Sequence, residues 1–288
     1  MVVLVAGGSG QLGQSLQFIA GNYPEIAFHF LSSSELNIAD KENSKKVFSD
    51  LKPDYVINAA AYTAVDKAES EPEKAQLINV EGAKNLAETC KDFNATLIHI
   101  STDFVFDGNK NTPYTEEDIP NPTGVYGQTK LEGEKAVESI LEAYFIVRTS
   151  WLYSQFGNNF MKTMIRFGNE RDSLNVVADQ IGTPTNAVDL AEAIVAIIKY
   201  AENLKSEISN LKSLYGIYHF SNEGQCSWFD FAKKIFEINE IVIDLHPIPT
   251  SSYPTPAMRP KYSVLKKEKI KQNFNVEIKN WENSLLKL

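Results

Sequence analysis

Over the first 150 residues, short apolar runs alternate with amphipathic stretches, and this pattern predicts strands that alternate with helices. Residues 2–6 (VVLVA) form a continuous apolar run, which is typical of a buried parallel strand. An amphipathic stretch at 11–20 predicts a helix, and Pro72 opens a longer one over 72–91. The remaining predictions are strands at 27–31, 55–57, 96–100 and 145–147, and helices at 43–51 and 125–141.

This order of elements predicts an α/β protein with a doubly wound parallel sheet of the Rossmann type. Beyond Trp151 the alternation weakens. It leaves helices at 189–200 and 228–238, and a stretch with five prolines at 246–260 that we expect to be an ordered loop. We predict a dinucleotide-binding domain from residues 1–150 plus about 179–213. A smaller C-terminal α/β domain for the substrate is expected from about 151–178 plus 214–288.

Composition narrows the function classes. The chain has 288 residues, of which 43% are hydrophobic and 23% charged, which is ordinary for a globular protein with a sizeable core. Its net charge of −9 argues against nucleic-acid or membrane-surface partners, although a small anionic ligand can still bind a locally basic site. Cys90 and Cys226 are far apart, and the four histidines show no zinc-ligand spacing. With no targeting segment or long apolar run recognised, we expect a cytoplasmic protein with reduced thiols.

A glycine-rich turn follows the first predicted strand directly. Residues 7–13 read GGSGQLG, so Gly7, Gly10 and Gly13 fit one spacing and Gly8, Gly10 and Gly13 another. Glycines at these positions allow a tight turn and let the backbone approach a pyrophosphate at the positive end of a helix. The position before a helix in a βαβ pattern favours a dinucleotide site over a merely flexible loop.

The residues that follow the second predicted strand are expected to contact the adenosine half of the cofactor. Ser32-Ser33-Ser34 and Glu35 include no adjacent Lys or Arg, so NADPH and NADH both remain open. Asn37 and Ile38 are candidate adenine contacts. Ala61, Tyr62 and Thr63, after the third strand, are candidates for a wall of the cofactor site.

A second motif indicates acid–base chemistry. Tyr126 and Lys130 are four residues apart in a predicted helix, which places the phenol and the ammonium on one face. We expect the ammonium to lower the pKa of Tyr126, and a fall of about 3 units corresponds to roughly 4 kcal/mol. Tyr126 could then protonate a carbonyl oxygen near neutral pH. Ser101, Thr102 and Asp103 end the fourth strand, where Thr102 could bond the same oxygen.

Seven segments together resemble one enzyme family along nearly the whole chain. They are NAAAYTAVDKAESEP at 58–72, HISTDFVFDG at 99–108, VYGQTKLEGE at 125–134, RTSWLY at 148–153, GNNF at 157–160, DQIGTPT at 179–185 and YPTPAMRP at 253–260. They resemble the extended branch of the short-chain dehydrogenase/reductase superfamily and, within it, the dTDP-4-dehydrorhamnose reductases. The resemblance implies reduction of the C4 ketone of dTDP-4-dehydro-β-L-rhamnose to dTDP-L-rhamnose by hydride from NADPH or NADH.

The resemblance also implies residue roles. Thr102, Tyr126 and Lys130 match the catalytic triad. The matching cofactor contacts are Gly10, Gln11, Leu12, Asn37, Ile38, Ala61, Tyr62 and Thr63, with Tyr126 and Lys130 beside the nicotinamide ribose. Thr102, Asp103 and Trp151 match sugar contacts, and Arg259 is expected at the substrate diphosphate. Trp151 has an alternative interpretation as ordinary core packing.

The chain departs from the family pattern at three positions. Asn37 stands where an acid is common, and Phe104 where a Tyr is common. Some members place a metal-binding Glu on the first helix, where this chain has Ser15, which counts against Mg²⁺ and against a dimer that depends on it. A monomer and a homodimer are both left open.

Two alternative functions remain. One is another nucleotide-sugar reductase, an epimerase or a dehydratase of the same superfamily. Dehydratases usually carry Asp-Glu after the Thr, whereas Asp103 is followed here by Phe104. The other is a non-catalytic regulatory subunit of methionine adenosyltransferase, which the intact Thr102, Tyr126 and Lys130 argue against. The product stereochemistry, rhamno or talo, is also left open.

Overall fold

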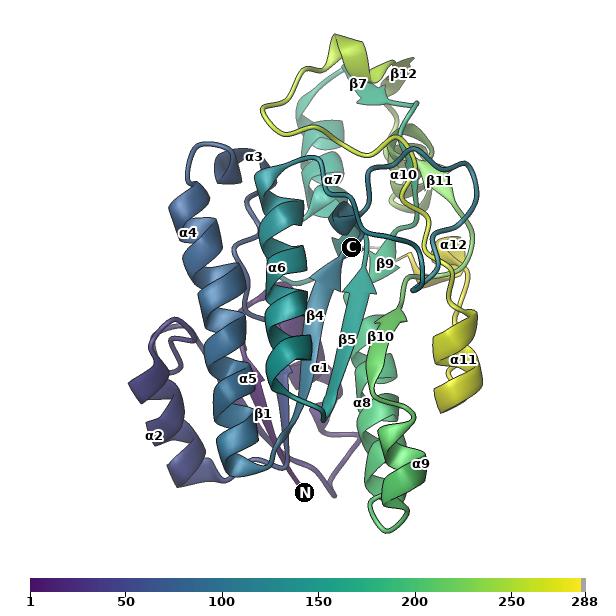
Figure 1. The fold of residues 1–288 in the computed structure, drawn as a ribbon. Helices are drawn as coiled ribbons and strands as arrows, with labels where there is room; N and C mark the ends of the chain where they lie inside the picture. The colour runs from purple at the N-terminus through teal and green to yellow at the C-terminus, as the bar shows by residue number, and fades with distance from the viewer. Residues whose placement is uncertain (286–288) are drawn as a thin grey trace.

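A six-stranded parallel sheet forms the centre of the molecule in a computed structural model that describes residues 1–285 (Figure 1). Its strand order is β10-β5-β4-β3-β1-β2, and every neighbouring pair is parallel. The strands are β1 (Val2–Ala6), β2 (Ala27–Leu31), β3 (Tyr55–Asn58), β4 (Thr96–Thr102), β5 (Tyr144–Thr149) and β10 (Gly216–His219). The predicted fold class is confirmed.

Helices cover both faces of this sheet. One face packs on α1 (Gln11–Ala20), α8 (Ala187–Asn203) and α11 (Glu268–Phe274), and the other on α2 (Lys41–Leu51), α5 (Gly82–Phe93) and α6 (Val125–Ile140). Val3, Val5 and Ile57 point to the first layer, whereas Leu4 and Val56 point to the second. Because helices cover both faces of the sheet, both sides of these strands are buried, which agrees with their continuous apolar sequences.

The predicted helix at 72–91 is interrupted by a π-helical turn. It runs as α4 (Pro72–Gln76), the π turn (Leu77–Glu81) and α5, and it is preceded by the short helix α3 (Val65–Ala68). π turns of this kind often mark functional positions in a helix. Here the turn packs closely against α6. A Cβ atom added at Gly133 of α6 would lie only 2.2 Å from the Asn79 carbonyl oxygen.

A smaller layer follows Trp151. It contains α7 (Phe160–Glu170), α10 (Trp228–Ile238), α12 (Trp281–Ser284) and short strands in pairs. The pairs are β6 (Leu152–Tyr153) with β9 (Thr185–Asn186), β8 (Ile181–Gly182) with β11 (Cys226–Ser227), and β7 (Ser173–Val177) with β12 (Asp244–Ile248). Two short helical turns (Asp103–Val105, Thr250–Ser252) and α9 (Ile208–Lys212) complete the described elements.

One sequence-based prediction needs correction here. The predicted loop at 246–260 begins in a strand, because β12 pairs with β7 in parallel, with Pro247 opposite Val176. The division into two domains stays a prediction; within the segment 214–288, β10 is a strand of the central sheet, and Ile270 and Phe274 of α11 join its core. Residues 286–288 of that segment lie outside the described part of the chain.

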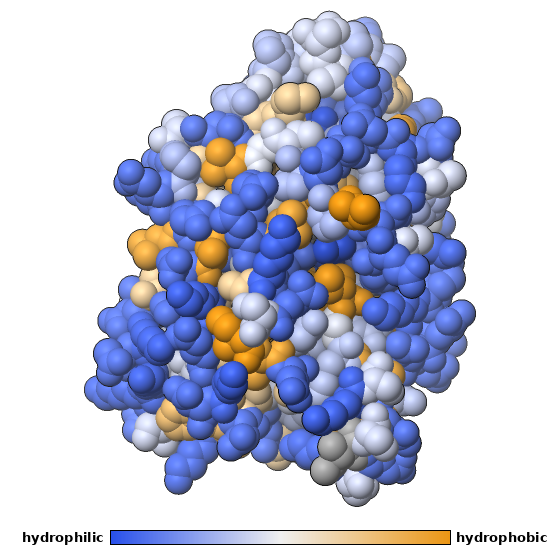
Figure 2. Space-filling view, viewed as in Figure 1, coloured by the Kyte–Doolittle hydropathy of each residue, from blue (hydrophilic) through white to orange (hydrophobic). Residues whose placement is uncertain are grey.

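The surface on the side shown in Figure 2 is mainly hydrophilic, with separate hydrophobic patches among the polar side chains. Cys90 and Cys226 are buried and unpaired among residues 1–285. No helix in this range has both the length and the apolar character needed to cross a membrane.

Candidate active site

The carboxyl ends of β1, β3, β4 and β5 bring together the segments that carry the predicted site. The glycine turn follows β1, Ala61–Thr63 follows β3, Thr102 ends β4, and Trp151 follows β5. Because all these strands are parallel, their carboxyl ends share one edge of the sheet, where ligands bind in doubly wound folds.

The glycine turn after β1 has the shape of a phosphate-binding loop. Gly7 has a φ of +82°, a backbone conformation that favours glycine. A Cβ atom added at Gly13 would lie 2.4 Å from the Gly7 carbonyl oxygen, so this position has no room for a side chain. Gly10 caps α1, and no side chain within residues 1–285 bonds the first-turn N–H groups as a cap. These groups are therefore left for an anion at the positive end of the helix. The turn fits a dinucleotide pyrophosphate.

Gln11 connects this turn to the loop after β6. Its amide donates to the Leu152 carbonyl at 3.1 Å and accepts from Asn159 Nδ2 at 2.7 Å. Asn159, from the GNNF segment, also caps α7. The Gln11 side chain thus joins the cofactor turn to the smaller layer.

At the end of β2, Glu35 folds back onto Ser32. Its carboxylate accepts from the Ser32 N–H at 2.8 Å and from the Ser32 hydroxyl at 2.7 Å. Asn37 is exposed beyond this turn, and Ile38 is buried against Gly82. The structure therefore places the predicted adenine contacts beside the end of β2, with a carboxylate nearby.

Asn79 in the π turn is a residue that the sequence analysis missed. Its amide accepts from the Tyr62 N–H at 2.9 Å and donates to the Tyr62 carbonyl at 3.2 Å. It also donates to Thr129 Oγ1 at 3.1 Å, one residue before Lys130. Asn79 therefore holds the loop 61–63 against α6. A polar residue at a buried position of an amphipathic helix was the available signal.

Thr102 and Tyr126 meet at the end of β4. Burial of the Tyr126 hydroxyl raises its pKa to about 12, and the nearby Thr102 side chain opposes this shift. The Tyr126 ring meets Phe104 edge-on, with the ring centroids 5.6 Å apart. Beside them, burial raises the pKa of Asp103 to about 6, and Thr102 donates to its carboxylate at 3.1 Å.

The predicted effect of Lys130 on Tyr126 is wrong in this structure, since the pKa of Tyr126 is raised. The Lys130 amine donates instead to the Ile100 carbonyl at 2.7 Å and lies 3.5 Å from His99 Nε2. Burial lowers the pKa of Lys130 to about 8. Spacing i, i+4 puts both side chains on one face of α6, but it does not bring the two polar ends together.

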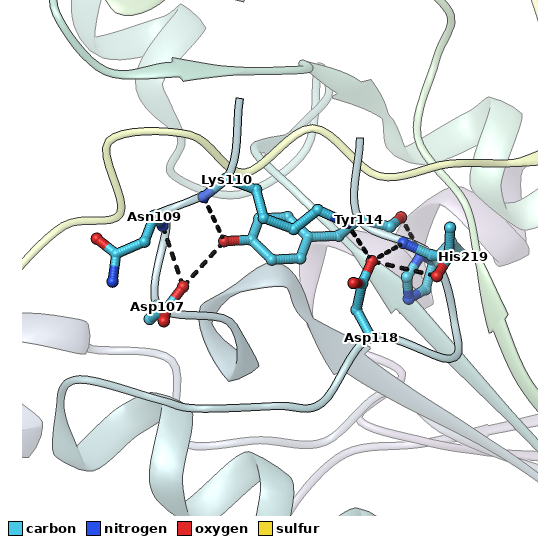
Figure 3. A network of polar contacts seen from close by, with 7 residues as sticks. Asp107, Asn109, Lys110, Tyr114, Asp118 and His219 are labelled. Atoms are coloured by element: carbon cyan, nitrogen blue, oxygen red, sulfur yellow. Dashed lines mark hydrogen bonds and ion pairs between the residues drawn. The ribbon is translucent and has the colours of Figure 1, made fainter. Parts of the chain in front are cut away.

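The loop between β4 and α6 is held by a polar network (Figure 3). Asp107 accepts from Tyr114 Oη at 3.0 Å, and Lys110 pairs with Asp118 at 2.6 Å. His219 of β10 contacts the Tyr114 carbonyl at 3.1 Å through Nδ1. Thr102 and Tyr126 stand at the two ends of this loop.

A cavity of about 720 Å³ lies in the smaller layer and is bordered by Asp66 of α3. Asp66, Phe160, Trp228, Tyr253 and Arg259 are among its lining residues, and its size suits a ligand larger than a single sugar.

Trp151 stacks on Trp228, one of the residues that line this cavity. The ring centroids are 3.5 Å apart and the rings nearly parallel, and Trp151 has a φ of +46°. This backbone conformation is unfavourable for a bulky residue and is typical of functional positions.

Arg259 reaches the same cavity but is paired within the protein. It donates through Nη2 to Asp66 Oδ2 at 2.8 Å, and its Nη1 has no hydrogen-bond partner among residues 1–285. The Ala257 N–H also donates to Asp66, at 3.3 Å. One side of the guanidinium is therefore fixed while the other keeps a donor for an anion.

Comparison with known proteins gives a consistent result along the chain. A family model described as RmlD substrate binding domain matches residues 1–288. A dTDP-4-dehydrorhamnose reductase of Sinorhizobium fredii is 41% identical over 292 residues, which cover 100% of this chain and 96% of that relative.

Two solved structures are similar to this one. A dTDP-4-dehydrorhamnose reductase of Clostridium acetobutylicum has a TM-score of 0.91 and 41% identity, with 99% of this chain and 96% of that chain covered. One from Bacillus anthracis, in complex with NADP, has a TM-score of 0.90 and 40% identity, with 98% and 96% covered.

Proposed function

Because this chain belongs to the RmlD substrate binding domain family, we propose that it reduces the C4 ketone of dTDP-4-dehydro-β-L-rhamnose to dTDP-L-rhamnose. The observation that carries this proposal is the Thr102–Tyr126 pair at the carboxyl end of β4, beside a glycine turn that fits a dinucleotide. An acid at that position and a hydride donor on the neighbouring turn are what reduction of a ketone requires.

Tyr126 is the proposed acid. With a pKa raised to about 12 it stays protonated at neutral pH, so it can give its proton to the alkoxide that forms at C4. Thr102 lies beside this hydroxyl and could orient the ketone oxygen toward it. Burial keeps water from competing for the developing oxyanion.

The cofactor would be held by the glycine turn and by the loops that border it. Gly7, Gly10 and Gly13 would face its pyrophosphate, Asn37 and Ile38 its adenine, and Ala61–Thr63 its nicotinamide half. When bound, the nicotinamide supplies the hydride. A relative binds NADP, and the Ser32–Glu35 turn carries no cation, so we propose that both NADPH and NADH are accepted.

The nucleotide sugar is assigned to the cavity in the smaller layer. Trp151 and Asp103 would contact the sugar, and Arg259 would bind the diphosphate through its unpaired Nη1. A two-part organisation, with the cofactor on the sheet and the nucleotide in the smaller layer, follows from this assignment.

A turnover assay with Tyr126→Phe tests the function. The protein is given dTDP-4-dehydrorhamnose, generated in situ, with NADPH or NADH, and the loss of reduced nicotinamide and the sugar product are measured. We expect dTDP-L-rhamnose from the wild type, and a turnover lower by roughly 10²–10⁴-fold in the variant with unchanged cofactor affinity. Cofactor binding without turnover in the wild type would contradict the reductase assignment. A talo product would leave the reaction class intact and change its stereochemistry.

A further inference from the structure

The GNNF segment at 157–160 reaches the cofactor turn, and the proposed reaction assigns it no role. Asn159 caps α7, because its side-chain oxygen accepts from the Lys162 N–H at 3.1 Å. An N–H group can only donate, so this bond fixes the orientation of the Asn159 amide and leaves Nδ2 as the donor on its other side. Nδ2 donates to Gln11 Oε1 at 2.7 Å and to the Ser154 carbonyl at 2.8 Å, and these bonds use both of its hydrogens.

The orientation of the Gln11 amide is fixed in the same way. Its Oε1 accepts from Asn159, and its Nε2 donates to the Leu152 carbonyl at 3.1 Å. Because a carbonyl can only accept, neither amide can turn round without losing a hydrogen bond. The two side chains therefore form a chain of hydrogen bonds with a single direction, from the backbone of α7 to the backbone of β6. Gln11 itself begins α1, at the end that fits the cofactor pyrophosphate.

Both ends of this chain of hydrogen bonds adjoin aromatic residues of the smaller layer. Leu152 follows Trp151, and Asn159 precedes Phe160. The Trp151 and Phe160 rings both contact Trp228, with ring centroids 3.5 and 4.6 Å apart. Phe160 and Trp228 line the cavity assigned to the nucleotide sugar. One glutamine of the cofactor turn thus holds the backbone next to two members of a three-ring cluster at the cavity.

The three-ring cluster is tightly packed at Trp151. A Cβ atom added at Gly182 would lie 2.5 Å from the Trp151 ring, so this ring is in close contact with the Gly182 backbone as well as with Trp228. A close-packed ring cannot absorb a movement of its own backbone. A shift at the Leu152 carbonyl would therefore pass to Trp228 and the cavity.

We propose that Gln11 and Asn159 are positioning residues that couple the two ligand sites, so that a bound dinucleotide raises the affinity for the nucleoside diphosphate of the substrate, and the reverse. The cofactor pyrophosphate would fix the Gln11 backbone, and the nucleotide would fix α7 and Trp228. Each ligand orders the same chain of hydrogen bonds, so the second ligand meets a site that is already ordered. The locations of both ligands rest on the proposed function.

Two substitutions break this chain of hydrogen bonds, one from each side. Gln11→Met keeps the length of the side chain and removes both of its bonds. Asn159→Ser keeps a good helix cap but is too short to reach Gln11. Both variants should keep the two layers docked, because the Phe18 and Phe156 rings still meet at 6.0 Å and β6 still pairs with β9.

Binding measurements on the full chain test the coupling without catalysis. The probes are NADP⁺ and dTDP, and titration calorimetry gives the Kd of each one alone and with the other at saturation. In the wild type we expect each probe to lower the Kd of the other by the same factor, roughly fivefold. In Gln11→Met and Asn159→Ser this factor should fall toward one. Because the factor is a ratio of two affinities in one protein, a uniform loss of cofactor affinity cancels.

Gln14→Met is the matched control. Gln14 lies three residues further along α1, and its amide donates to the Ser9 carbonyl at 2.8 Å, within the cofactor turn. The same substitution at this position removes a hydrogen bond of the turn but leaves the bonds from Gln11 to Leu152 and Asn159 in place. The coupling factor should therefore keep its wild-type value.

A factor of one in the wild type would overturn the proposal, whatever the variants do. An undiminished factor in either variant, shown to be folded by circular dichroism, would do the same, and so would an equal loss in Gln14→Met. Failure of dTDP to bind would remove the proposal together with the assignment of the cavity. None of these results depends on turnover, so the turnover assay judges the reductase assignment separately.

Discussion

Arg259 and Asp66 form an ion pair at 2.8 Å that connects the loop after β12 to the short helix α3 after β3. Asp66 also accepts from the Ala257 N–H, so one carboxylate holds both the backbone and the guanidinium of this loop. The ion pair lies at the cavity assigned to the nucleotide sugar.

We predict that Asp66→Asn weakens substrate binding through Arg259. An amide still accepts from Ala257, but it no longer holds the guanidinium by charge, so Arg259 loses its orientation. The KM for the nucleotide sugar should rise roughly tenfold, which is about 1.4 kcal/mol, while cofactor affinity stays unchanged. Arg259→Lys should raise KM at least as much. An unchanged KM in both variants would remove Arg259 from the substrate site.

Gly13→Ala should disrupt the cofactor turn. The new methyl group would lie 2.4 Å from the Gly7 carbonyl oxygen, so the turn or α1 must shift. We expect a loss of about 1–3 kcal/mol in the free energy of unfolding and weaker NADPH binding, measured by denaturation and by cofactor fluorescence. Gly21→Ala is the control, because nothing lies within 4 Å of its added carbon and its φ is −60°.

Asp103 should make stability depend on pH. Its pKa of about 6 in the folded protein exceeds the ordinary 3.8, so between these values the folded state binds more protons than the unfolded state. Its contribution is therefore complete below pH 4 and is lost as the pH rises through 6.

Asp103→Asn removes this dependence, and the comparison of the two proteins isolates it. Relative to the variant, the wild type should lose about 2 kcal/mol of unfolding free energy between pH 4 and pH 7. Urea denaturation at several pH values measures the difference. A constant difference across that range would mean that Asp103 ionises normally.

The buried pair Arg148–Glu134 should be sensitive to removal of one partner. Both side chains are almost fully buried, with 2% and 1% exposed. Glu134→Gln leaves the guanidinium without a counter-charge, and we expect a cost of about 3–5 kcal/mol in unfolding free energy. Glu142→Gln is the control, since its ion pair with Lys212 is exposed and its loss should leave the denaturation midpoint unchanged. Similar effects in both variants would contradict this expectation.

Elements with local signals could be predicted closely from the sequence. The helices at 11–20 and 228–238 have the predicted bounds, because a glycine turn begins one and a capping box of Ser227 and Asp230 begins the other. The first two predicted strands also have the observed bounds, whereas the ends of the other three differ by one or two residues, since they depend on hydrogen bonds with neighbours that the pattern does not contain.

Features that depend on distant partners could not be predicted. The strand β12 includes Pro247, which is tolerated because β12 lies in a two-stranded pair with β7, some 70 residues earlier. The spacing of Tyr126 and Lys130 predicted their common face, but the partners of Lys130 come from β4. The apolar pattern of 72–91 predicts one continuous helix, and the π turn within it was not predicted.

The π turn at 77–81 holds one residue more than a regular helical turn would. In genetic terms it is equivalent to the insertion of a single codon into an ordinary helix. Deleting one residue there would rotate α4 by about 100° relative to α5 and withdraw Asn79 from Tyr62 and Thr129. Insertion of a single residue is therefore enough to turn a helix that only covers the sheet into one whose Asn79 also holds the loop 61–63 and α6.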